Sequence, residues 1–75
     1  MERYQNINGD SGIYAYEIEP ETIKVEFTDG ALYLYTYQSA GKTSIEKMKK
    51  LALAGRGLNE FINTHVDKAY ERKIR

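Results

Sequence analysis

The strictest alternation of apolar and polar residues runs from Thr22 to Phe27. Its apolar and charged positions fall on opposite sides of the segment: Ile23, Val25 and Phe27 against Lys24 and Glu26. Because side chains of a β-strand alternate between its two faces, this period of two predicts a half-buried strand. The stretch from Gly12 to Ile18 alternates less regularly, and its apolar pattern places Tyr14, Tyr16 and Ile18 on one face of an earlier strand. Pro20 follows and predicts a turn between the two strands.

A third strand is expected from Ala31 onwards, after a reversal at Asp29-Gly30, because glycine accepts the positive φ of a tight hairpin. Two registers are open. A two-residue loop pairs Val25 with Leu34 and leaves Tyr33, Tyr35 and Tyr37 on the outside of the sheet. A three-residue loop, Thr28–Gly30 with a glycine bulge, reverses the parity and places Tyr33 and Tyr35 in the core.

Two helices are expected after the strands. Thr43-Ser44-Ile45-Glu46 fits a capping box, and the helix that it begins is expected to run to Ala54 and to end at Gly55. Gly57 permits a bend into a second helix, whose apolar stripe has helical spacing: Leu58, Phe61, Ile62, His65, Val66, Ala69 and Tyr70. Asn59 lies near the start of that helix, where its simplest role is a cap.

These elements predict an α+β domain in which a three-stranded antiparallel β-meander is followed by two α-helices packed on one face (βββαα). Residues 12–70 form the predicted domain. Residues 1–11, with the turn-favouring cluster Asn8-Gly9-Asp10, are expected to be a flexible lead-in, and residues 71–75 a frayed tail.

Charge is balanced overall but divided along the chain. Residues 1–41 carry two basic and seven acidic side chains, whereas residues 42–75 carry nine basic and four acidic ones. The C-terminal part can therefore attract an anionic partner. The alternative is that its basic residues form solvated helix faces, partly neutralised by the acidic strands.

Catalytic and metal-binding patterns are weak in this sequence. Cysteine is absent, and the single histidine, His65, falls on an apolar stripe where packing is its expected role. The segment Ser39–Thr43 resembles part of a phosphate-binding loop, but Thr36 stands where the first glycine of that motif belongs. We therefore expect no enzyme activity, no cofactor and no metal. Without a signal peptide or a membrane-spanning apolar run, a cytoplasmic protein is expected.

Several short patterns in order resemble the KTSC domain family. They are Phe27-x-x-Gly30-x-x-Tyr33-x-Tyr35, Gly55-x-x-Leu58-Asn59-x-x-Ile62 and the closing Tyr70, with Ala15-Tyr16-Glu17 similar to the usual Gly-Tyr-Asp segment. After its paired tyrosines the family usually has Val-Pro, where this chain has Thr36-Tyr37-Gln38-Ser39. The family is named from an occurrence at the C-terminus of some lysyl-tRNA synthetases. Most members are small bacterial or phage proteins of unknown function, for which RNA binding has been suggested. The resemblance implies inward-facing tyrosines and no enzyme activity.

Two functions follow as hypotheses. The first is binding of RNA or another single-stranded nucleic acid, with phosphates on the basic residues and bases stacked on the tyrosines: Lys42, Lys47, Lys49, Lys50 and Arg56, with Tyr33, Tyr35 and Tyr37. The second is a protein-protein interaction or homodimerisation module that pairs through a free edge of the first or third strand. Neither hypothesis includes a membrane partner.

Overall fold

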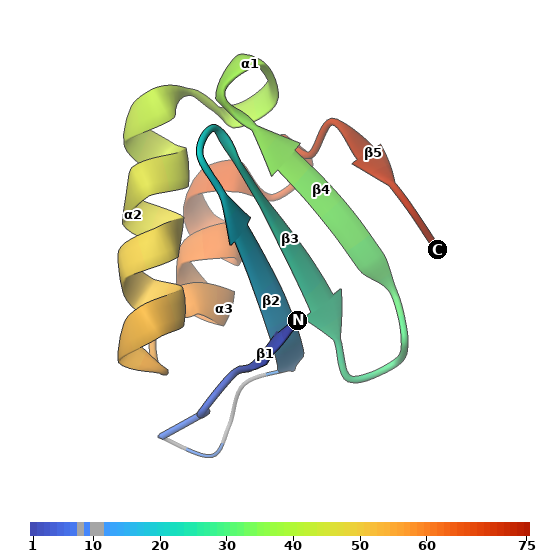
Figure 1. The fold of residues 1–75 in the computed structure, drawn as a ribbon, viewed down its shortest axis with the longest axis vertical. Helices are drawn as coiled ribbons and strands as arrows, with labels where there is room; N and C mark the ends of the chain where they lie inside the picture. Colours follow the sequence, from blue (N-terminus) through green and yellow to red (C-terminus); the bar gives the residue numbers. More distant parts are fainter. Residues whose placement is uncertain (8, 10–11) are drawn as a thin grey trace.

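The computed structural model describes residues 1–7, 9 and 12–75, and these residues form an antiparallel sheet with helices against one face (Figure 1). The sheet has five strands in the order of the chain: β1 (Glu2–Arg3), β2 (Ile13–Glu19), β3 (Thr22–Phe27), β4 (Leu32–Thr36) and β5 (Arg72–Lys73). The helical elements are α1 (Tyr37–Ala40), α2 (Lys42–Ala54), α3 (Leu58–Phe61) and the π-helical η1 (Ile62–Val66). The α+β class with an antiparallel sheet is confirmed, whereas the order βββαα omits β1, β5 and α1.

Phe27 and Ala31 form the last pair before the chain reverses, so the hairpin loop has three residues, Thr28–Gly30, which settles the register. The Phe27 amide donates to the Ala31 carbonyl at 2.8 Å, and Gly30 has a φ of +93°. Val25 therefore pairs with Tyr33, and Ile23 pairs with Tyr35. Since paired residues share a face of the sheet, the two tyrosines point towards the helices.

A bulge in β2 changes the face of its first residues. The β2–β3 pairing shifts between Ile13 and Ala15, so Ile13 is buried while Tyr14 is 43% exposed. The expectation that Tyr14 shares a face with Tyr16 is therefore wrong. An extra residue in one strand reverses the alternation on its far side.

Both ends of the chain join the sheet, in contrast to the expected lead-in and tail. Tyr4 is 5% exposed, and its hydroxyl accepts a hydrogen bond from the Leu58 amide at 3.2 Å, which holds the N-terminal segment against the core. At the other end, the Ile74 amide donates to the Leu32 carbonyl at 2.7 Å. Asn8, Asp10 and Ser11, three residues of the expected lead-in, lie outside the described residues.

Helix α2 ends as predicted but begins differently. Its last residue is Ala54, and Gly55 closes it in the left-handed region with φ +76°. The expected capping box at Thr43 does not form, because the helix begins at Lys42 with Gly41 as its cap. A reciprocal capping box occurs instead at α1, where Thr36 and Ser39 bond each other's backbone amides.

The second predicted helix is divided and shorter than its apolar stripe. Its buried residues recur every fourth position, at Leu58, Ile62 and Val66, and the helix ends before Ala69 and Tyr70. Within η1 the Thr64 hydroxyl donates to the Glu60 carbonyl at 2.8 Å. This side-chain hydrogen bond gives the carbonyl a partner besides the backbone amides, and it occurs at the wider π turn.

Two side-chain predictions on this helix need correction. His65 packs as expected, on Phe61 with ring centroids 4.5 Å apart, but it does so while exposed, because the wider turn moves it off the buried stripe. Asn59 does not cap the helix, since Gly57 holds the cap position with no side-chain hydrogen bond.

Candidate functional site

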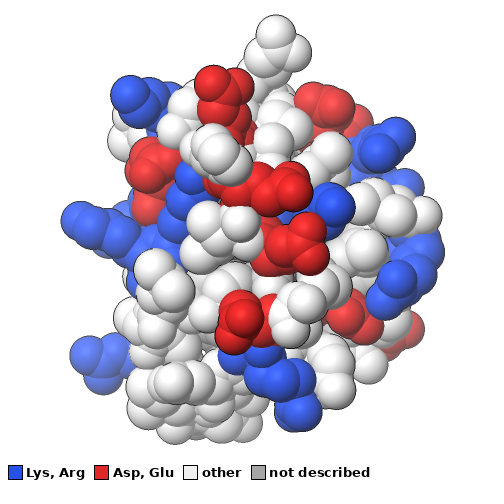
Figure 2. All heavy atoms as spheres, in the orientation of Figure 1, with Lys and Arg blue, Asp and Glu red and all other residues white. Residues whose placement is uncertain are grey.

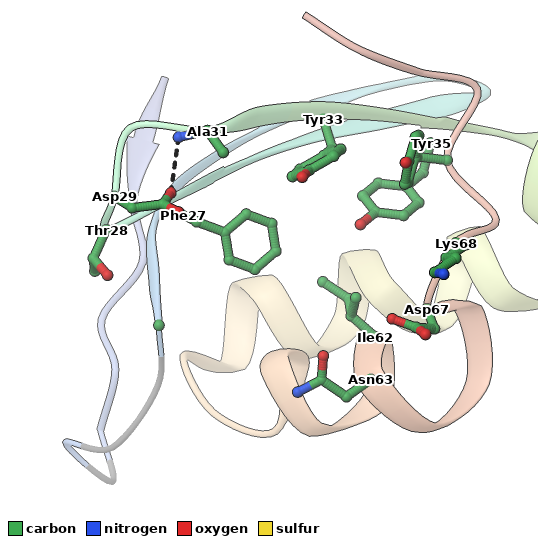
Figure 3. Close-up of a pocket in the computed structure, with 12 residues that line it drawn as sticks. Phe27, Thr28, Asp29, Ala31, Tyr33, Tyr35, Ile62, Asn63, Asp67 and Lys68 are labelled. Atoms are coloured by element: carbon green, nitrogen blue, oxygen red, sulfur yellow. Dashed lines mark hydrogen bonds between the residues drawn. The ribbon is translucent and has the colours of Figure 1, made fainter. Parts of the chain in front are cut away.

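An open pocket of about 460 Å³ lies between the hairpin end of the sheet and helix η1. Figure 3 shows Phe27, Tyr33 and Tyr35 extending from the sheet towards the helix, with Ile62 and Asn63 facing them. The pocket exists because the three-residue loop turns these rings to the helical side of the sheet, where η1 covers them only in part.

Aromatic rings form the wall of the pocket on the sheet side. Tyr33 makes an edge contact with Phe27 at 5.6 Å between centroids and a tilted contact with Tyr70 at 4.7 Å. Tyr70 in turn meets Tyr35 edge-on at 6.3 Å. Phe27, Tyr33 and Tyr70 are each only half-buried, so this wall presents apolar ring surface to the pocket.

Polar groups form the opposite side and the mouth of the pocket. Asn63, Asp67 and Lys68 come from η1 and the residues just after it, and Thr28 and Asp29 come from the hairpin loop. One Asp29 oxygen accepts the Ala31 amide at 3.0 Å and so belongs to the turn. Burial raises the pKa of the Tyr35 phenol far above its usual range, with the neighbouring Tyr33, Tyr70 and Asp67 adding to the effect. Tyr35 therefore stays neutral.

The tyrosines predicted to stack bases have three different environments. Tyr35 is 1% exposed and offers no ring face to a ligand, because it fills the core between the sheet and the helices. Tyr33 lines the pocket. Tyr37 lies away from it at the start of α1, where its hydroxyl donates to Glu46 at 2.6 Å.

The basic residues predicted from sequence do not meet the rings of the pocket. One of them, Lys49, does lie beside a predicted tyrosine, with its ammonium 5.8 Å from the centre of the Tyr37 ring. Lys42, Lys47, Lys50 and Arg56 are exposed on or just after α2, and none of them lines the pocket. Lys49 is held by two acceptors, the Pro20 carbonyl at 2.7 Å and the Glu46 carboxylate at 3.0 Å. The Glu46 carboxylate thus accepts hydrogen bonds from the Tyr37 hydroxyl and from Lys49, and these two donors, first Tyr37 and then Lys49, lower the pKa of Glu46.

A second basic group lies beside the aromatic pocket. The Lys73 ammonium stands 5.9 Å from the centre of the Tyr33 ring, and Lys68 lines the pocket itself. Arg72 and Arg75 are exposed on the same C-terminal segment, where Arg75 pairs with Glu26 at 3.2 Å. Figure 2 shows basic side chains at both flanks of the molecule, with acidic side chains gathered between them. The cations near the rings of the pocket are therefore C-terminal, not those of α2.

Sequence reasoning did not assign a ligand-binding role to Phe27, Asn63, Asp67, Lys68 or Tyr70. The only available signal was that Asn63 and Asp67 each follow a buried position of the helix stripe, Ile62 and Val66, and so fall on one flank. The flank can be recognised as one side of a pocket only from the structure, which places the hairpin opposite it.

Both strand edges that were expected to be free are paired over part of their length. Glu2–Arg3 pairs with β2 at Tyr16 and Ala15, and the C-terminal segment pairs with β4 over Leu32–Leu34. Among residues 1–7, 9 and 12–75, no cluster of acidic, histidine or cysteine side chains is arranged to hold a metal ion. No helix in the described part of the chain is long and apolar enough to cross a bilayer.

Comparisons of this chain with family models, curated proteins and solved structures return no match.

Proposed function

We propose that this protein binds single-stranded RNA, with a base in the pocket between the sheet and η1 and the adjoining phosphates on the basic C-terminal segment. One observation carries the proposal: the pocket combines half-buried rings with an ammonium group 5.9 Å from one of them. Single-stranded nucleic acids are held in this way, by stacking on aromatic side chains beside cations that contact the backbone.

The pocket suits a base better than a rigid duplex. Its volume of about 460 Å³ admits one base with its sugar, and its rings come from β3, β4 and the segment after η1. A base can reach these rings only when it is unstacked from its neighbours, as in loops and single strands. The exposed α2 residues Lys42, Lys47 and Lys50 and the adjacent Arg56 would then add weaker contacts to a longer strand.

Membership of the KTSC family remains part of this proposal. The register with Tyr33 and Tyr35 facing the helices is what the family pattern implies, and it supports the resemblance. At the position where the family has Val-Pro, the chain has the residues that cap α1, Thr36 and Ser39. Homodimerisation through a strand edge is less favoured, because the C-terminal segment already pairs with β4.

Fluorescence anisotropy with a labelled single-stranded oligoribonucleotide at low salt tests the proposal. Tyr33→Leu, which keeps an apolar side chain in the wall, should weaken binding about 5- to 150-fold, the worth of one stacked base. Tyr14→Leu is the matched control, because Tyr14 is an exposed ring outside the pocket.

A second pair of variants separates the two basic groups. Lys73→Gln should weaken binding and reduce its salt dependence by about 0.7 in the logarithmic slope, one phosphate contact on a single strand. Lys50 is an exposed lysine of α2, and Lys50→Gln should change both the affinity and its salt dependence much less. A loss confined to Lys50→Gln would move the binding site to α2, and no binding at all would reject the proposed function.

A further inference from the structure

The helix side of the pocket carries hydrogen-bonding groups that stacking does not use. Asn63 on η1 and Asp67, the residue just after it, lie four residues apart, and both line the pocket. Figure 3 shows their side chains on the same side of the pocket, below Phe27 and Tyr35. A base lying against the rings would present its edge to them.

The Asp67 carboxylate is available for a ligand. No hydrogen bond or ion pair joins this side chain to another residue in ranges 1–7, 9 and 12–75, whereas Asp29 is engaged in its turn. An ionised carboxylate has only acceptors, and its two oxygens can take two parallel N–H donors. A planar ligand with two adjacent donors on one edge is therefore its best match.

Among the common RNA bases, guanine has such an edge. Its N1–H and exocyclic amine lie side by side, with the O6 acceptor next to them. Uracil places one N–H between two carbonyls, and adenine and cytosine place an amine beside a ring acceptor, so each would set an oxygen or nitrogen acceptor against the carboxylate. The Asn63 amide can donate to O6 while Asp67 accepts the two N–H groups.

We infer that Asp67 and Asn63 make the pocket selective for guanine, a specificity that rests on the proposed RNA-binding function. The charges at the mouth favour the same orientation. The cations near the pocket are Lys68, which lines it, and Lys73, which lies against Tyr33. Phosphates are attracted to these two ammonium groups and repelled by the Asp67 carboxylate, which leaves the base edge facing Asp67.

Labelled pentanucleotides test the inference: UUUUU, UUAUU, UUGUU and UUIUU, where I is inosine, which lacks the 2-amino group of guanine. UUGUU should bind at least about fivefold more tightly than UUUUU or UUAUU, the lower end for a bidentate base contact. UUIUU should lose most of this preference. Asp67→Asn should abolish it, because the amide of the variant would set a donor against one of the two N–H donors of guanine.

Glu60→Gln is the matched control, because Glu60 is an exposed acid on α3 that does not line the pocket. It should keep the guanine preference. Equal binding of all four strands by the wild type would overturn the selectivity and leave RNA binding intact, and so would a preference that survives Asp67→Asn. Failure of every strand to bind would reject the proposed function, and binding of an arginine-rich peptide in their place would assign the pocket to a protein partner.

Discussion

Gly55 closes helix α2 where the N-terminal segment lies directly against it, and this contact can be tested by adding one methyl group. The Gly55 carbonyl accepts the Ile7 amide at 2.8 Å. A Cβ at Gly55 would lie 2.7 Å from the Cβ of Gln5, closer than packed carbon atoms tolerate. Gly57 has a similar backbone, with φ +82° against +76°, but its nearest neighbour would be 3.5 Å away, on Leu51.

The two glycines therefore separate backbone strain from packing. An L-residue in the left-handed region costs about 1–2 kcal/mol, which is the expected loss in unfolding free energy for Gly57→Ala. Gly55→Ala should lose that amount and about 1–3 kcal/mol more, because the methyl group overpacks the contact with Gln5. A chain of 75 residues has about 4–11 kcal/mol of total stability, so the second variant should be visibly destabilised.

Urea unfolding followed by circular dichroism measures both losses. Gln5→Gly removes the opposing Cβ, so Gly55→Ala made in a Gln5→Gly background should cost no more than Gly57→Ala does in the wild type. Equal losses for the two single glycine variants would refute the reasoning, since they would mean that the N-terminal segment does not lie against the end of α2.

Three further predictions concern the core, the caps and pH. Tyr35→Ala should cost about 3–5 kcal/mol of unfolding free energy, and Tyr14→Ala under about 1 kcal/mol, because the first ring is 1% and the second 43% exposed; urea unfolding compares them. Thr36→Ala should cost about 0.5–2 kcal/mol in the same assay, because the side chain caps α1 and bonds Glu71. The bonds from Tyr37 and Lys49 lower the pKa of Glu46 in the folded state, so their stabilisation is present above its ordinary value of 4.5 and is lost as pH falls through the folded value. Stability measured across that range should decline less in Glu46→Gln than in the wild type, and identical declines would contradict the assignment.

The central strand and the end of α2 were predictable because each has a local signal. Thr22–Phe27 alternates without interruption, and Gly55 follows the last helical residue in a conformation that favours glycine. The short edge strands have no such signal, since two residues cannot show a period. Tyr4 is the exception that sequence reasoning overlooked, as an aromatic residue in a polar segment that anchors β1 beside the core.

Two local irregularities limited the prediction of which side chains face the core on β2 and on the second helix. The bulge near Tyr14 and the π turn at Ile62–Val66 each change the period of an element from within, and neither contains proline or glycine. His65 illustrates the result, because a strict helical period places it on the buried stripe and the wider turn exposes it.

The candidate site was predictable in its residue types more than in its arrangement. From the sequence, the strand tyrosines and the lysines of α2 were assigned to one RNA-binding site, since tyrosine rings can stack on bases and lysines can contact phosphates. In the structure Tyr33 lies beside Lys73, a residue of the segment that was expected to fray. That proximity depends on the pairing of β5 with β4, a contact between residues about 40 positions apart that no local pattern encodes.

The three-residue hairpin loop also predicts how this sequence can change in evolution. A substitution at one ring position alters one contact, whereas loss of a single residue between Phe27 and Ala31 would exchange the two faces of β4 and carry Leu32 and Leu34 to the helical side. Point changes in the strand should therefore accumulate among descendants of this protein while the length of the loop stays fixed. Conservation of length at Thr28–Gly30, more than identity of the rings, should mark the chains that keep the pocket.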